Sequence, residues 1–107
     1  MIKIAPSLLS ADFANMGEAT RKLGEWNADL VHFDVMDGTF VPTITFGPAM
    51  CAAIRPYTEL PIDVHIMVEH PETYIDQFAK AAQTILRSMQ RPMHMRTERF
   101  RQYAARA

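Results

Sequence analysis

The 107-residue chain contains one cysteine, Cys51, and only four glycines. A single cysteine excludes an intramolecular disulfide and is typical of a reducing compartment, so we expect a cytoplasmic protein. No run approaches the roughly 18 apolar residues that a membrane-spanning helix needs. Residues 1–13 are too short, and too soon interrupted by Pro6 and Asp12, to be a secretion signal. The formal net charge is −1, so neither nucleic acid nor a membrane surface is expected as a partner.

The overall composition is that of an ordinary globular domain, with 49% hydrophobic and 21% charged residues. The average conceals a break in charge. Residues 1–81 contain five basic and eleven acidic residues, a net of −6, whereas residues 82–107 contain six arginines and one acid, a net of +5. All four glycines precede the break. We therefore divide the chain into a first portion, 1–81, and a basic tail, 82–107.

Short apolar runs alternate with helical patterns in the first portion. Three runs predict strands: IKIA (2–5), DLVHFDVM (29–36) and LPIDVHIMV (60–68). Three segments predict helices: one after Ser10 or Asp12 with Phe13, Met16, Ala19, Leu23 and Trp26 on one face, one over 48–57, and one over 70–82 with Tyr74, Ile75 and Phe78 buried. Strands that alternate with helices pair in parallel, so an α/β fold is predicted.

A constellation of polar side chains interrupts the second and third predicted strands. His32, Asp34 and Met36 are two residues apart, so they share one face, and His65 shares a face with Met67. If the strands are neighbours in a parallel sheet, the histidines and the aspartate converge near its carboxyl end. Two imidazoles and a carboxylate suit Zn, Fe or Mn. A carboxylate beside a divalent metal can also take a proton from a substrate carbon.

Each of these residues also has a simpler interpretation. A histidine on a strand is often a satisfied core or rim residue, and short motifs match by chance. The simpler roles are a turn or cap for Ser7, packing for Met36 and Met67, a turn for Asp37-Gly38, inert core for Cys51, and a position ahead of a helix for His70.

Three long segments resemble, in order and spacing, the N-terminal part of the ribulose-phosphate 3-epimerase family: IAPSLLSADFANMGE, VHFDVMDGTFVPTITFGP and LPIDVHIMVEHPETYIDQFAKA. The resemblance covers residues 1 to about 81. It implies the first three βα units of a (β/α)₈ TIM barrel. The implied activity interconverts D-ribulose 5-phosphate and D-xylulose 5-phosphate, in the pentose phosphate pathway, by moving the proton at C3. Allulose-6-phosphate 3-epimerases share this framework, so a six-carbon sugar phosphate is the alternative substrate.

The resemblance also implies roles for individual residues. One divalent ion (Zn, Fe, Mn or Co) would be bound by His32, Asp34 and His65. Asp34 would also be one of the two acid/base residues. The substrate would be contacted by four side chains, of which the two methionines line the wall over the reacting carbon: Ser7, His65, Met36 and Met67.

The family places its second catalytic aspartate and its glycine-rich phosphate loops on later strands, beyond the matching segment. Three strands cannot close a barrel, so we expect exposed edges that favour self-association, and little or no activity from this chain by itself. The alternative is a non-catalytic half-barrel module that pairs with itself or with another chain.

The tail, AQTILRSMQRPMHMRTERFRQYAARA, departs from the family's pattern. Back-translation with freely chosen codons, with one base restored near codon 81 or 82, yields a sequence that ends in the family-like TIQAIRSAG. We interpret the tail as the product of a shifted reading frame. A genuine basic helix that binds a partner is the alternative interpretation.

Sequencing the gene through and beyond codon 107 tests the shifted frame. We expect a second frame that encodes the family's later strands, its second catalytic aspartate and its phosphate loop. If no such frame follows, the tail is a genuine segment with a role of its own.

Overall fold

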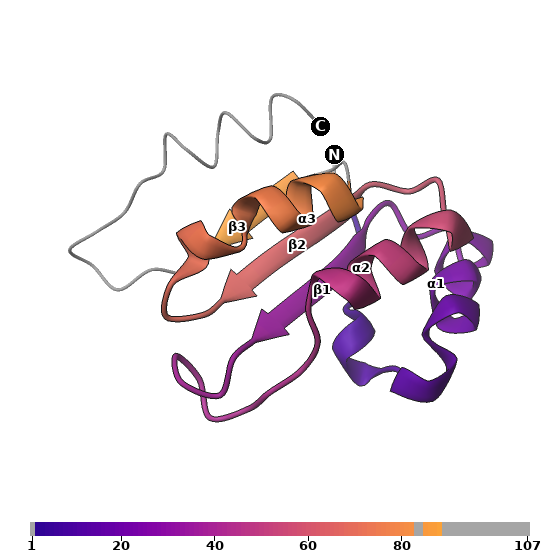
Figure 1. The fold of residues 1–107 in the computed structure, drawn as a ribbon. Helices are drawn as coiled ribbons and strands as arrows, with labels where there is room; N and C mark the ends of the chain where they lie inside the picture. The colour runs from indigo at the N-terminus through magenta and orange to yellow at the C-terminus, as the bar shows by residue number, and fades with distance from the viewer. Residues whose placement is uncertain (1, 83–84, 89–107) are drawn as a thin grey trace.

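The structure, a computed structural model, describes residues 2–82 and 85–88. Within them, three parallel strands form one sheet in the order β1 (Val31–Met36), β2 (Ile62–Met67), β3 (Ile85–Ser88) (Figure 1). The α-helices are α1 (Met16–Glu25), α2 (Pro48–Ile54) and α3 (Ile75–Ala82), and four 3-10 turns accompany them: η1 (Leu8–Ser10), η2 (Phe13–Asn15), η3 (Arg55–Tyr57) and η4 (Pro71–Thr73). The predicted α/β architecture, with parallel strands and intervening helices, is confirmed.

The apolar face of the sheet carries the core. Alternate residues of both strands are fully or almost fully buried on this face: Val31, Phe33 and Val35 of β1, and Ile62, Val64 and Ile66 of β2. α2 and α3 cover them (Figure 1), with Ile54 and Phe78 buried against the same cluster. Because strand side chains alternate between faces, the remaining residues of β1 and β2 lie on the opposite, more open face. The predicted division of β1 into an apolar and a polar face is therefore confirmed.

The strand predicted over residues 2–5 is wrong as a regular strand. This segment does lie beside β1, because the carbonyl of Ile4 accepts from the amides of Asp29 and Leu30, and Ser7 forms a single parallel bridge with His32. No regular ladder develops, since the Ile4 amide donates to the Asp29 side chain and Pro6 has no amide proton to donate. The segment is an irregular edge of the sheet.

The first helix begins later than predicted and buries fewer of the predicted side chains. Asp12 caps the short turn η2, and α1 starts only at Met16. Asn27, with φ of 60°, ends the helix in a left-handed conformation, and the Ala28 amide bonds back to the carbonyl of Leu23. The chain therefore leaves the helix axis at Trp26. Phe13 and Trp26, placed on the buried face by helical spacing, are 40% and 70% exposed because both lie outside the helix.

A proline begins α2, and another begins the 3-10 turn η4 that precedes α3. Pro48 occupies the first turn of α2, and Pro71 the first turn of η4, as expected for a residue without an amide proton. Ile75 and Phe78 are buried as predicted, but Tyr74 is 37% exposed because it lies between η4 and α3.

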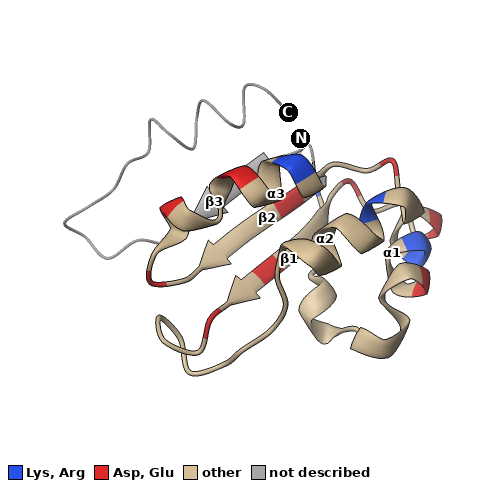
Figure 2. Cartoon of the chain, in the orientation of Figure 1, with Lys and Arg blue, Asp and Glu red and all other residues tan. Residues whose placement is uncertain are grey.

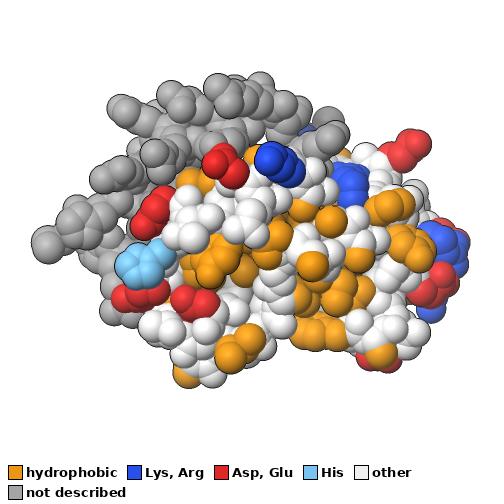
Figure 3. All heavy atoms as spheres, in the orientation of Figure 1, with side chains coloured by type: hydrophobic (Ala, Val, Ile, Leu, Met, Phe, Trp, Pro, Cys, Tyr) orange, Lys and Arg blue, Asp and Glu red, His pale blue; other side chains and the backbone are white. Residues whose placement is uncertain are grey.

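The surface around this core is mixed in character. Hydrophobic side chains are exposed over the middle of the helical face, and charged side chains lie toward its rim (Figure 3). No helix among the described residues is long and apolar enough to cross a membrane. Of the basic tail, Ala82 ends α3 and Ile85–Ser88 pair with β2, while 83–84 and 89–107 lie outside the described residues.

Candidate metal centre

The register between β1 and β2 brings polar residues of the open face side by side. His32 lies opposite Asp63 in the ladder, and Asp34 lies opposite His65. Asp34 and Asp63 are buried, and both histidines are partly buried. Two cross-strand pairs of a carboxylate and an imidazole therefore stand next to each other on one face.

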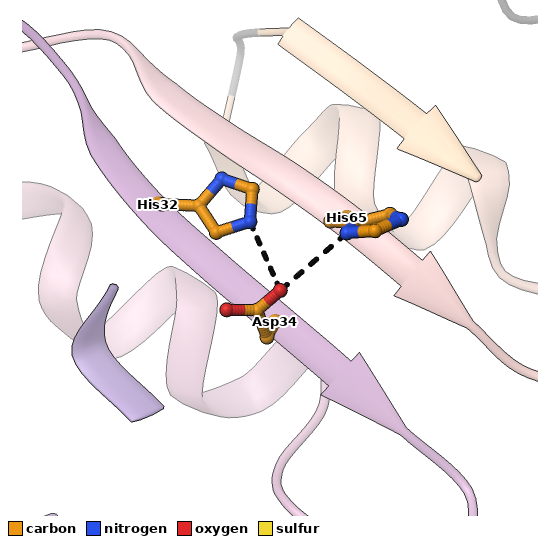
Figure 4. A group of neighbouring side chains, drawn as sticks. All are labelled: His32, Asp34 and His65. Atoms are coloured by element: carbon orange, nitrogen blue, oxygen red, sulfur yellow. Dashed lines mark hydrogen bonds and ion pairs between the residues drawn. The ribbon is translucent and has the colours of Figure 1, made fainter. Parts of the chain in front are cut away.

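Both imidazoles approach one oxygen of Asp34. Nε2 of His32 lies 2.9 Å from Asp34 Oδ1, and Nδ1 of His65 lies 3.5 Å from the same oxygen (Figure 4). The ligand atoms of the three residues all lie within 4.8 Å of one another. The convergence expected from strand alternation is present.

This donor set fits a divalent transition metal. Imidazole nitrogen and carboxylate oxygen are ligands for Zn, Fe, Mn and Co, and three protein ligands leave at least one position for water or substrate. The side chains of His32 and His65 are 23% and 26% exposed, so the group can be reached from the open face. The three side chains could therefore hold a divalent ion that solvent or a ligand reaches from the open face.

Ser7 caps η1 and also contacts the candidate site. Its Oγ accepts from the Leu9 amide, which caps η1, and donates to Asp34 Oδ2 at 2.5 Å. The cap interpretation is confirmed, and the same hydroxyl lies at the candidate site. The two oxygens of Asp34 thus have different surroundings, since Oδ1 faces the imidazoles and Oδ2 faces a hydroxyl.

The two methionines extend the open face toward the carboxyl ends of the strands. Met36 and Met67 are partners in the ladder, two positions beyond Asp34 and His65 and on the same face. Met67 is buried and Met36 is partly buried.

His70 lies outside the candidate site. It is exposed, and its Nδ1 is 3.6 Å from a carboxylate oxygen of Glu72. Cys51 is fully buried in the core, and this burial raises the pKa of its thiol to about 12, as an inert residue requires.

Asp37, predicted only as a turn residue, connects two loops. Its Oδ2 accepts from the Glu69 amide beyond β2, and its Oδ1 accepts from the amides of Thr39 and Phe40. Gly38 follows with φ of 79°, and a Cβ there would lie 2.7 Å from Ile44. The Asp37 carboxylate therefore joins the loop after β1 to the loop after β2 at the carboxyl end of the strands.

Two further residues at the site escaped prediction. The Thr45 hydroxyl donates to the carbonyl of Asp34 and accepts from the Met36 amide, so it holds the end of β1. Asp63 lies 3.1 Å from Nδ1 of His32. The signal for Asp63 was present in the alternation of β2, because it is two residues from His65 and shares its face.

Acidic residues lie on the sheet and on the loops at its carboxyl end. Figure 2 shows acidic positions on β1, on β2 and on the loops beyond both arrowheads, and further acidic positions on α1 and α3. Such a distribution attracts cations toward the carboxyl end of the strands.

Several known proteins similar in sequence to this chain come from one family. The sequence model of the ribulose-phosphate 3 epimerase family matches residues 3–102. The chain is 56% identical over 86 residues to a ribulose-phosphate 3-epimerase of Bacillus subtilis, which is 80% of this chain and 40% of that protein. It is 54% identical over 85 residues to ribulose-phosphate 3-epimerase 1 of Cupriavidus necator, covering 79% of this chain and 35% of the relative. The chloroplastic ribulose-5-phosphate-3-epimerase of Arabidopsis thaliana is 47% identical over 85 residues, covering 79% of this chain and 30% of the relative.

The bridging role of Asp37 predicts a pH dependence of stability. The Glu69 amide above all, and the Phe40 amide next, hold the pKa of Asp37 below its ordinary value of 3.8. A lowered folded-state pKa stabilises the fold above the unfolded pKa, and this contribution is lost as pH falls through the folded pKa. The free energy of unfolding should therefore fall more steeply for the wild type than for Asp37→Asn between about pH 5 and about pH 2, measured by urea denaturation. Glu59→Gln, at an exposed acid, is the control, and equal slopes for wild type and Asp37→Asn would contradict the prediction.

Proposed function

Because the chain belongs to the ribulose-phosphate 3 epimerase family, we propose that it supplies the first strands, the metal ligands and one catalytic carboxylate of a metal-dependent sugar-phosphate epimerase. The proposed reaction interconverts D-ribulose 5-phosphate and D-xylulose 5-phosphate by removing the C3 proton from one face and returning a proton to the other. The observation that carries the proposal is the approach of both imidazoles to a single oxygen of Asp34.

We assign one divalent ion to His32, Asp34 and His65. The fit rests on the donor set and on the 4.8 Å limit within which its ligand atoms lie. When bound, the ion would supply positive charge beside the sugar oxygens on which negative charge develops as C3 loses its proton.

Asp34 would move the proton. Its Oδ2 faces the Ser7 hydroxyl rather than the imidazoles, so one oxygen can serve as a ligand while the other remains available to the substrate. Proton exchange at two faces of C3 requires two acid/base groups, and Asp34 supplies the one on its own side. Ser7 would orient the Asp34 carboxylate and contact the substrate.

Met36 and Met67 would form an apolar wall beside the reacting carbon. Their ladder position, two residues beyond Asp34 and His65 in each strand, places them toward the carboxyl end of the strands. Thioether side chains adapt to the shape of a ligand and exclude water, which limits loss of the proton to solvent. Allulose 6-phosphate is the alternative substrate, since the same proton chemistry at C3 serves both ketose phosphates. The relatives from Bacillus subtilis and Cupriavidus necator are ribulose-phosphate 3-epimerases, which favours the five-carbon sugar.

A chimaera tests this function. The segment of the Bacillus subtilis relative that aligns over 86 residues is replaced by the corresponding residues of this chain. We expect the chimaera to epimerise D-ribulose 5-phosphate, and Asp34→Asn to lower its kcat by about 10²-fold to 10⁴-fold, as the loss of an acid/base group does.

The metal site is tested in the same chimaera by titration with Co²⁺. His32→Ala and His65→Ala should each weaken Co²⁺ binding by at least about tenfold. His70→Ala, a histidine outside the cluster, is the matched control and should leave both kcat and Co²⁺ affinity unchanged. An active chimaera that is indifferent to Asp34→Asn and His32→Ala would refute the assignment.

We also propose that the chain by itself associates with a second copy through its irregular edge. Ile2 and Ile4 on this edge are 92% and 61% exposed, and no strand of the described residues pairs with its outer side. A groove of about 430 Å³ lies beside it, lined by Pro6, Leu8, Leu23 and Trp26 among others. Open edges with apolar side chains favour strand pairing between chains.

Sedimentation velocity over a range of protein concentrations measures this association. We expect Ile4→Lys to weaken it, because a lysine on a sheet edge opposes pairing with another chain. Ile44→Lys introduces the same change at a side chain that is 78% exposed in the loop after β1, and it should leave association unchanged. A wild-type chain that is monomeric at every concentration contradicts the proposal.

A further inference from the structure

Asp63 is a buried carboxylate behind the candidate metal ligands. It lies in β2 on the same face as His65, and only 5% of its surface is exposed. The ladder sets it directly opposite His32, and its Oδ2 lies 3.1 Å from Nδ1 of that histidine. Burying a carboxylate costs free energy unless polar groups contact it, so the contact with His32 offsets part of this cost.

His32 contacts a carboxylate at each ring nitrogen. Nδ1 faces Asp63 at 3.1 Å, and Nε2 faces Asp34 at 2.9 Å. A neutral imidazole carries one proton, and an ionised carboxylate only accepts hydrogen bonds. If the proton is on Nδ1, it is donated to Asp63. Nε2 and Asp34 Oδ1, 2.9 Å apart, then both carry free lone pairs, as two ligands of one cation must.

The two histidines need opposite tautomers to act together. His32 presents Nε2 to Asp34, whereas His65 presents Nδ1 to the same oxygen (Figure 4). A metal-ligating nitrogen must carry no proton, so His32 must be protonated on Nδ1 and His65 on Nε2. Strand geometry alone does not select the tautomer of a neutral histidine, so each ring depends on the group at its other nitrogen.

We propose that Asp63 is a positioning residue that fixes His32 as the Nδ1-protonated tautomer and holds its ring with Nε2 toward Asp34. Its consequence for metal binding rests on the proposed function above, but the tautomer itself does not. Asp63→Asn keeps the shape of the side chain and can turn its amide nitrogen toward Nδ1. It would then stabilise the opposite tautomer, in which Nε2 carries the proton and cannot bind a metal.

Nitrogen-15 NMR of the histidine rings in this chain tests the tautomer, at a pH at which the ring is neutral. The wild type should show His32 protonated at Nδ1, and Asp63→Asn should shift the signal toward the Nε2-protonated form. Glu59→Gln removes an exposed acid just before β2 and should leave the His32 spectrum unchanged. A wild-type His32 protonated at Nε2 would overturn the proposal without reference to any variant.

Co²⁺ titration then separates this inference from the proposed metal site. Asp63→Asn should weaken Co²⁺ binding by about 10-fold to 100-fold, the usual effect of removing a carboxylate behind a ligating histidine. Wild-type affinity in Asp63→Asn would overturn the positioning role in metal binding. If the wild-type chain binds no Co²⁺, the proposed metal site fails, and the ring spectrum alone decides whether Asp63 holds His32.

Discussion

The register of the parallel ladder between β1 and β2 is the constraint on which the candidate site depends. It pairs His32 with Asp63 and Asp34 with His65, so both imidazoles meet one carboxylate. A slip of one residue would turn the polar residues of one strand toward the helices and expose its apolar residues. The same register therefore buries Phe33 and Val64 under the helices and assembles the polar group behind them. Core packing and site geometry are two results of a single alignment.

Hydrogen bonds in the loops at the carboxyl end of the strands stabilise this alignment. The carboxylate of Asp37 joins the loop after β1 to the amide of Glu69 after β2. Thr45 returns to β1 and bonds to the carbonyl of Asp34 and the amide of Met36. These contacts fix the strand ends relative to each other, as the proposed function requires, because a displacement of about 1 Å is costly in a catalytic arrangement.

Alternation along the strands was enough to predict the polar face, because period-two spacing follows from backbone geometry. It placed His32, Asp34 and His65 together once the strands were taken as neighbours. Asp63 was missed although the same alternation contains it, since its partner is decided by register and not by its own strand. The edge segment at Ile4 and the exposed Trp26 were misjudged for another reason. Local pattern does not reveal that the Asp29 side chain takes a ladder amide or that the chain turns at Asn27.

Charge balance on the open face gives the strongest physical reason to expect a cation there. Asp34 and Asp63 are 8% and 5% exposed, and both lie against His32. Two buried carboxylates beside two imidazoles concentrate negative charge in a region where water can screen it only from one side. A divalent ion matches the charge of two carboxylates, and Asp34 contacts both imidazoles. Asp63 would then orient His32 while Asp34 binds the ion, so the two carboxylates would have separate roles in the same site.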